Sequence, residues 1–177
     1  MSAVLGIDGG GTRTRASIVD GERVLAFAEN GSIKRLRVGA EAAETNLRAL
    51  LKDVFAQAGV RGVKAASAGV ASSSMPGVKE WITAVFGNFG VERSEIVGDE
   101  VIALDGAFKG GPGILQIAGT GSNCIGRAPD GGRAARHRAI GEPFGQCRAA
   151  DVAHREVRQV VVLAEFINRN DVRVIEL

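Results

Sequence analysis

Tyrosine is absent from this 177-residue chain, and tryptophan occurs only once. Arginines crowd the last third of the sequence, but only two phenylalanines, Phe144 and Phe166, lie among them. A surface that binds single-stranded nucleic acid combines positive charge with aromatic residues that stack on the bases. A solvated, arginine-rich surface is therefore favoured over a basic patch for an acidic partner, and no nucleic-acid partner is expected.

Cysteine is scarce, and the pair Cys124 and Cys147 lacks the spacing of a metal site, so reduced thiols are expected. No apolar run approaches the ~20 residues that cross a membrane. The N-terminus opens directly into a predicted strand, without the basic region and cleavage site of a signal peptide. We therefore expect a cytoplasmic protein with no membrane partner, whose length suits one domain of ordinary size.

Glycine is abundant instead, with 25 residues that cluster in turns. The most informative cluster is Asp8-Gly9-Gly10-Gly11-Thr12, which directly follows the apolar run Val4–Ile7. A carboxylate at a strand end, then backbone without side chains, then a hydroxyl can hold a phosphate tail and its Mg²⁺ against main-chain amides. A second stretch, Gly119-Thr120-Gly121-Ser122, follows the apolar strand Gly113–Ala118 and offers a second phosphate-facing turn.

Two other phosphate motifs are missing. A dinucleotide fingerprint reads G-x-G-x-x-G and leads into a helix, whereas the first glycines here are contiguous and Thr12–Val19 alternates like a strand. A Walker P-loop needs Gly-Lys-Ser or Gly-Lys-Thr, and neither occurs. The first glycine stretch is therefore either a phosphate-holding turn or a glycine-rich hairpin turn with no ligand.

Apolar periodicity predicts an alternation of strands and helices. Helices are expected from Gly39 for about twenty residues to a terminating Gly59, from Pro76 onward, and over Val101–Phe108. Strands are expected at Val4–Asp8, Arg13–Val19, Val24–Ala28, Lys64–Ala71, Glu95–Gly98, Gly113–Ala118 and Asn123–Arg127.

This order predicts a mixed α/β fold with two acidic residues, Asp8 and Asp99, at the ends of strands. Ligands of such sheets bind in the crevice outside the carboxyl ends of the strands. Both carboxylates are therefore expected to face one crevice.

Three motifs occur in order along the chain: Leu5–Thr12, Val97-Gly98-Asp99 and Ile117–Cys124. Together they resemble the BadF/BadG/BcrA/BcrD-type ATPase family, which includes the N-acetylglucosamine kinases and belongs to the actin-like, sugar kinase and Hsp70 ATPase superfamily. The resemblance implies a ribonuclease H-like mixed-sheet lobe, the first of two lobes that hold ATP between them, with the second lobe absent from this sequence. It further implies a nucleotide-phosphate-binding lobe over residues 1–130. Residues 131–177 would form a diverged extension whose one helix, at 149–167, packs on the same lobe.

The resemblance also implies roles for individual residues, with Mg²⁺ and ATP as cofactors. Asp8 would hold Mg²⁺ through water, and Asp99 would be the general base that accepts a proton from an acceptor hydroxyl. A helix N-cap is the alternative role for Asp99. The phosphates would be held by Gly9, Gly10, Gly11 and Thr12 in the first loop and by Gly119, Thr120, Gly121 and Ser122 in the second.

The chain also departs from the family. The segment after the third strand, residues 30–39, is unusually basic, which fits either an anionic ligand or a merely exposed charged loop. Residues 140–148 keep the glycine spacing of the family motif G-W-G-x-x-x-G-D-E-G-S but lack its tryptophan and its acidic pair. That loss weakens the inference that the chain binds the family's sugar substrate.

Three functional hypotheses fit the sequence. The leading one is an ATP-dependent phosphotransferase of the N-acetylglucosamine kinase type, or its nucleotide lobe, acting on a small sugar or amino-sugar hydroxyl. The others are a non-catalytic nucleotide- or sugar-binding module and an ATPase that drives a partner enzyme. An apolar face is expected where a second lobe would pack, and two copies of the chain could form a homodimer through this face.

Overall fold

The computed structural model of the chain describes residues 2–118 and 122–138, which fall into two compact units. One unit ends at Asp99 and the other begins at Glu100. The helix expected at 149–167 and the altered segment 140–148 lie outside the described residues.

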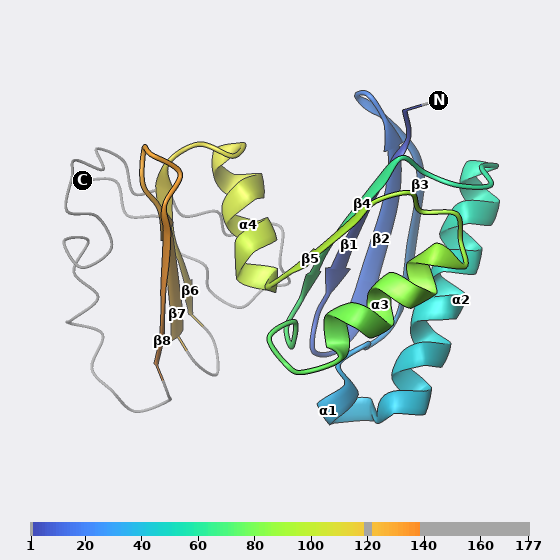
Figure 1. Cartoon of the computed structure of the whole chain (residues 1–177), viewed down its shortest axis with the longest axis horizontal. Helices are drawn as coiled ribbons and strands as arrows, with labels where there is room; N and C mark the ends of the chain where they lie inside the picture. Colours follow the sequence, from blue (N-terminus) through green and yellow to red (C-terminus); the bar gives the residue numbers. More distant parts are fainter. Residues whose placement is uncertain (1, 119–121, 139–177) are drawn as a thin grey trace. The chain divides into compact units, whose positions relative to one another are not determined.

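The N-terminal unit is built on a five-stranded mixed sheet in the order β3-β2-β1-β4-β5 (Figure 1). The first three strands form antiparallel pairs, whereas β4 runs parallel to β1 and β5 runs parallel to β4. This confirms the predicted mixed α/β class. The elements are β1 (Val4–Gly9), β2 (Arg13–Asp20), β3 (Arg23–Gly31), α1 (Arg35–Val38), α2 (Ala40–Ala58), β4 (Ala65–Val70), α3 (Val78–Gly87) and β5 (Ser94–Val97).

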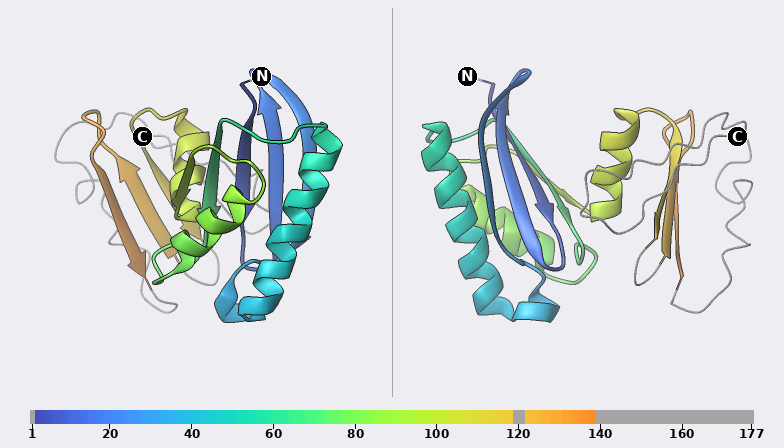
Figure 2. Two further views of the ribbon diagram at one scale, coloured as in Figure 1. Left: turned by 45° about the vertical axis from the view of Figure 1, so that its right-hand side comes forward. Right: turned by 180° about the vertical axis from the view of Figure 1, so that it is seen from behind.

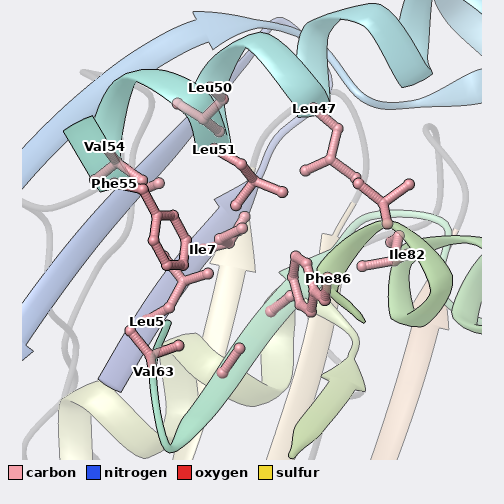
Figure 3. Close-up of a cluster of buried hydrophobic side chains, with 14 of the residues drawn as sticks. Leu5, Ile7, Leu47, Leu50, Leu51, Val54, Phe55, Val63, Ile82 and Phe86 are labelled. Carbon is pink, nitrogen blue, oxygen red and sulfur yellow. The ribbon is translucent and has the colours of Figure 1, made fainter. Parts of the chain in front are cut away.

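One face of this sheet is buried because apolar side chains alternate along each strand. On β1, for example, Leu5 and Ile7 are almost fully buried, whereas Val4, on the other face of the sheet, is 37% exposed. The helices α2 and α3 both contribute to the same core, which Figure 3 shows in close-up. Its largest fully buried side chains in this unit are Leu5, Ile18, Ile33, Leu47, Leu50, Leu51, Val54, Val70, Ile82, Val85 and Phe86.

The two long helices end and pack much as their sequences predict. The α2 helix spans 19 residues and stops at Gly59, whose φ of 66° is the left-handed conformation that glycine adopts most readily. Among the apolar residues of α3, Trp81 is only partly buried, and the Arg35 guanidinium lies over its ring. Figure 2 shows α2 lying along the sheet.

The opposite face of the sheet carries a mixture of side chains, with the apolar Val4, Val19 and Phe27 beside small and polar residues. A shallow hollow of about 550 Å³ lies there, over the amino-terminal half of β1 and its neighbours, and its floor includes Gly6, Ser17 and Ser67. The residues that line this hollow include none of the stretch Asp8–Thr12.

The second unit contains α4 (Asp99–Phe108), whose first residue is the last of the N-terminal unit, and a three-stranded antiparallel sheet. Its strands are β6 (Gly113–Ala118), β7 (Ser122–Arg127) and β8 (Arg133–Arg138). Leu104, Leu115 and Ile125 form its small buried core. The strand predictions for this region end at Arg127, so β8 is an addition to the predicted fold.

No helix in the described ranges is long and apolar enough to cross a membrane.

Candidate functional site

The candidate site lies at the carboxyl edge of the three parallel strands β1, β4 and β5. Asp8 of β1 stands opposite Gly69 of β4, and Gly69 stands opposite Val97 of β5. Asp99 follows two residues after Val97, at the start of α4. The structure therefore places both sequence-predicted carboxylates at the same edge of one sheet, in the same compact unit.

The two carboxylates influence each other electrostatically. Burial raises the pKa of Asp8 above its ordinary value, Arg15 on the neighbouring strand opposes this shift, and the negative charge of Asp99 adds to it. Asp8 and Arg15 face each other in the antiparallel register of β1 and β2. A divalent cation at this edge would relieve the repulsion between the two carboxylates, since it would neutralise both.

Arg15 is held in place by a second acid. Its Nε donates to Glu29 at 2.9 Å, and Arg13 donates to the other carboxylate oxygen of Glu29 at 3.0 Å. The hydrogen bond from Arg15 is the main reason that the pKa of Glu29 lies below its ordinary value. Both basic residues at the end of the first hairpin are thus paired, and neither is a free cation for a ligand.

The first glycine stretch forms the connection between β1 and β2. None of its three glycines has a positive φ, so their role is not to reach the left-handed region. The role of Gly9 is close approach: a Cβ there would lie 3.0 Å from Ile33 Cδ1, 3.1 Å from the Gly69 carbonyl oxygen and 3.2 Å from Val70 Cγ2. At Gly10 a Cβ would lie 3.0 Å from the Arg13 carbonyl oxygen. Side chains are therefore excluded from the base of the loop by neighbouring backbone.

Replacing Gly9 by valine tests this crowding. Three added carbons at a position already in contact on three sides are expected to cost about 3 kcal/mol of folding free energy, the upper end of the usual overpacking penalty. For a domain of this size the melting temperature should fall by roughly 6–12 °C. Thermal unfolding measures the effect.

The control is Gly6→Val on the same strand. A Cβ at Gly6 meets nothing within 4 Å, because the residue lies on the exposed face of the sheet. This substitution is expected to change the free energy of unfolding by no more than about 0.5 kcal/mol. Equal losses in the two variants would show that glycine is needed for backbone freedom at both positions and that crowding is not the reason.

Two side chains from the segment after β3 hold the carbonyl groups of the loop. Ser32 Oγ donates to the Gly10 carbonyl oxygen at 3.1 Å. Arg37 Nη1 donates to the Gly11 carbonyl oxygen at 2.8 Å and to Thr12 Oγ1 at 3.1 Å. Neither residue was singled out from the sequence. The only signal was that residues 30–39 are basic, which did not indicate what the basic side chains contact.

The rest of that basic segment also has contacts within the chain. Arg35 lies 5.1 Å over the ring of Trp81, and Asn30 uses its side-chain amide to donate to the Asn46 carbonyl oxygen at 3.4 Å. Of the two interpretations left open for this segment, an anionic-ligand loop and an exposed charged loop, neither describes it fully. Arg35 and Arg37 hold the segment to α3 and to the glycine loop.

The second predicted phosphate loop is only partly described. Gly119, Thr120 and Gly121 lie outside the described residues, and Ser122 is the first residue of β7, opposite Ala118 in the β6–β7 hairpin. The structure thus shows the strands on either side of this turn.

The residues at the carboxyl edge fit the chemistry of a magnesium–nucleotide site. Mg²⁺ usually takes one or two protein carboxylates and completes its shell with water and phosphate oxygens. Two carboxylates and a side-chain-free loop are present at this edge, whereas the described ranges hold no cluster of three or more acidic, histidine or cysteine residues that would cage a metal by protein ligands alone. The residues present therefore suit a metal that arrives with a phosphate tail.

One family model matches most of the chain. The model of the BadF/BadG/BcrA/BcrD ATPase family matches residues 5–165. None of the curated proteins compared with the chain matches it.

Solved structures show the same fold. A Chromobacterium violaceum protein assigned as an N-acetylglucosamine kinase is 29% identical, with a TM-score of 0.58 over 76% of this chain and 48% of the other. A Porphyromonas gingivalis protein with the same assignment is 21% identical, with a TM-score of 0.54 over 81% of this chain and 50% of the other. The ROK hexokinase of Thermus thermophilus is 21% identical, with a TM-score of 0.57 over 78% and 50%. The chain thus spans about half the length of these structures.

Proposed function

Since the chain belongs to the BadF/BadG/BcrA/BcrD ATPase family, we propose that it forms the nucleotide-binding lobe of an ATP-dependent phosphotransferase of the N-acetylglucosamine kinase type. The acceptor would be the hydroxyl group of a sugar or amino sugar. The observation that carries the proposal is the position of Asp8 and Asp99 at one edge of the sheet, with the glycine loop on the same strand end. The 29% identity to a protein assigned as an N-acetylglucosamine kinase supports the choice of acceptor.

In this proposal each residue has one task. Mg-ATP, when bound, supplies the phosphoryl group and the metal charge that stabilises its transfer. Asp8 holds the metal through water, and the backbone amides of Gly11 and Thr12 donate to phosphate oxygens. Asp99 accepts the proton of the acceptor hydroxyl as that oxygen attacks. Gly119, Thr120, Gly121 and Ser122 are proposed as the second phosphate loop.

The test is a calorimetric titration of the purified chain with Mg²⁺ and a non-hydrolysable ATP analogue. Dissociation constants in the micromolar range are expected, and the heat signal should disappear when Mg²⁺ is replaced by a chelator. No binding at millimolar analogue would overturn the proposal for this chain.

Turnover then separates the three functional hypotheses. A kinase releases ADP only when an acceptor sugar is present, and an ATPase that drives a partner releases it without any sugar. A binding module shows affinity without release of ADP under either condition. If two copies of the chain complete the site, the specific activity of a kinase also rises with protein concentration.

A further inference from the structure

Two carbonyl groups of the first glycine loop are held by the segment after β3. The Gly10 carbonyl oxygen accepts from Ser32, and the Gly11 carbonyl oxygen accepts from Arg37, so both carbonyl groups point toward the segment after β3. No peptide bond of the described residues is cis. In a planar trans peptide the C=O and the N–H that follows it point in opposite directions. The amides of Gly11 and Thr12 therefore point away from that segment.

These two amides have no other task in the described part of the chain. Neither Gly11 nor Thr12 donates its N–H to another backbone group there, although Gly9, at the base of the loop, accepts from the Ala71 amide at 3.3 Å. Successive N–H groups on one side of a glycine-rich turn form a concave site for an oxyanion. The direction of the carbonyl bonds thus decides where that site faces.

The segment that holds the carbonyls is itself fixed to α2. Asn46 of α2 donates to the Ser32 carbonyl oxygen at 2.9 Å, and the Lys34 amide donates to Ser32 Oγ at 3.1 Å. Arg37 lies in the short helix α1, whose first residue, Arg35, is held by its contact with Trp81. Residues 32–37, which we name the loop clamp, therefore connect the helix layer to the carbonyl side of the glycine loop.

Arg37 also places a positive charge beside the loop. It takes part in no ion pair among the described residues, and its Nη1 donates to two oxygens of the loop at once. Hydrogen bonds from a charged donor are stronger than those between neutral groups. Of the two clamp contacts, that of Arg37 is therefore the one expected to fix the loop more firmly.

We propose that Arg37 is a positioning residue for phosphate: it holds the Gly11 carbonyl group and the Thr12 hydroxyl group and, together with Ser32 on the Gly10 carbonyl group, aims the amides of Gly11 and Thr12 at the terminal phosphate of the nucleotide. This inference rests on the proposed function, because the oxyanion is that of the bound nucleotide. In this inference Arg37 contacts the glycine loop and does not bind the acceptor sugar. The positive charge of the segment is therefore no evidence that the acceptor is an anionic sugar.

The test compares Arg37→Met with Arg35→Met in the full chain. Both change an arginine of α1 to an uncharged side chain of similar length, but only Arg37 contacts the glycine loop. In Arg37→Met the affinity for the non-hydrolysable triphosphate should fall about tenfold relative to that for ADP, as the loss of one charge-assisted hydrogen bond predicts. Arg37→Lys should restore part of this preference, and Arg35→Met should lower only the melting temperature.

A second measurement needs no nucleotide. Backbone ¹⁵N relaxation of the ligand-free chain should give order parameters near about 0.85 for the Gly11 and Thr12 amides, falling toward about 0.6 in Arg37→Met and unchanged in Arg35→Met. If both arginine variants keep the triphosphate preference and the order parameters of the wild type, the inference is wrong while the proposed function stands. If the wild-type chain binds no nucleotide, the proposed function falls, and with it the inference.

Discussion

Asp99→Asn is expected to bind Mg-ATP like the wild-type chain and to lose acceptor-dependent release of ADP by about 10²–10⁴-fold, the usual contribution of a positioned general base. Asparagine keeps the size and polarity of the side chain but cannot accept the proton of the acceptor hydroxyl. Steady-state ADP release with an acceptor sugar, combined with calorimetric titration of the ATP analogue, separates the two quantities.

The matched control is Glu95→Gln on β5. Glu95 lies four residues before Asp99, is exposed, and belongs to the opposite face of the sheet from the core. Its substitution should leave both turnover and nucleotide affinity within about twofold, as for a surface change away from the site. Unchanged turnover in Asp99→Asn would rule out a general base at this position, and a large loss of Mg-nucleotide affinity would show that Asp99 is a metal ligand instead.

The removal of the Asp99 charge has a further consequence at Asp8. Because the charge of Asp99 raises the pKa of Asp8, Asp99→Asn should shift the titration of Asp8 toward lower pH. Carbon-detected NMR of the Asp8 carboxyl group follows this directly. An unchanged titration would mean that the two carboxylates lie further apart in solution than at the edge of this sheet.

The strands and the first glycine loop could be predicted because their signals are local. Alternation along Arg13–Asp20 follows from burial of every second side chain, and contiguous glycines after β1 reflect the backbone that surrounds Gly9. The end of α2 could be predicted for the same reason, since Gly59 alone supplies its left-handed termination. The expectation that Asp8 and Asp99 face one crevice followed from their positions at the ends of predicted strands, and the parallel pairing of β1, β4 and β5 places both at one edge.

The loop clamp and β8 could not be predicted, because their determinants are tertiary. The four residues of α1 have no side-chain cap, and Arg37 contacts Gly11, which lies 26 positions earlier. No periodicity in the sequence reports such a contact. The β8 strand is rich in arginine and, among the described residues, pairs with β7 alone, so its strand structure depends on a partner and not on an apolar pattern. Composition indicated that residues 30–39 are basic, but the direction of each side chain needed the fold.

Asp8→Asn is expected to weaken Mg-nucleotide binding by about 10–100-fold, because a carboxylate that orients metal-bound water is replaced by a neutral amide. The control is Asp20→Asn at the other end of the same hairpin, where the carboxylate accepts from Ser2 Oγ at 2.9 Å. That variant should bind the nucleotide like the wild type. Equal affinity of Asp8→Asn and the wild type would remove Asp8 from the metal site.

The same substitution should stabilise the ligand-free chain at neutral pH. The pKa of Asp8 is raised in the folded state, chiefly by burial, so the folded chain binds this proton more tightly than the unfolded chain does. The stability contributed by protonated Asp8 is present at low pH and is lost as the pH rises through the folded-state pKa. At pH 7 Asp8 therefore costs stability that Asp8→Asn recovers, and the advantage of the variant should shrink as the pH falls below the folded-state pKa and vanish below the pKa of the unfolded chain.

Binding of Mg-nucleotide should then reverse the order of the melting temperatures of the wild type and Asp8→Asn. At a nucleotide concentration 100 times its dissociation constant, the wild type gains about 2.7 kcal/mol, whereas a variant with 100-fold weaker binding gains only about 0.4 kcal/mol. Thermal unfolding at pH 7 should thus show Asp8→Asn as the more stable protein without Mg-nucleotide and the less stable one with it. If the wild type is the more stable protein under both conditions, Asp8 is a structural residue whose ionised form the fold requires. A reversal would show that the Asp8 carboxylate lowers the stability of the ligand-free chain but is required for binding of Mg-nucleotide.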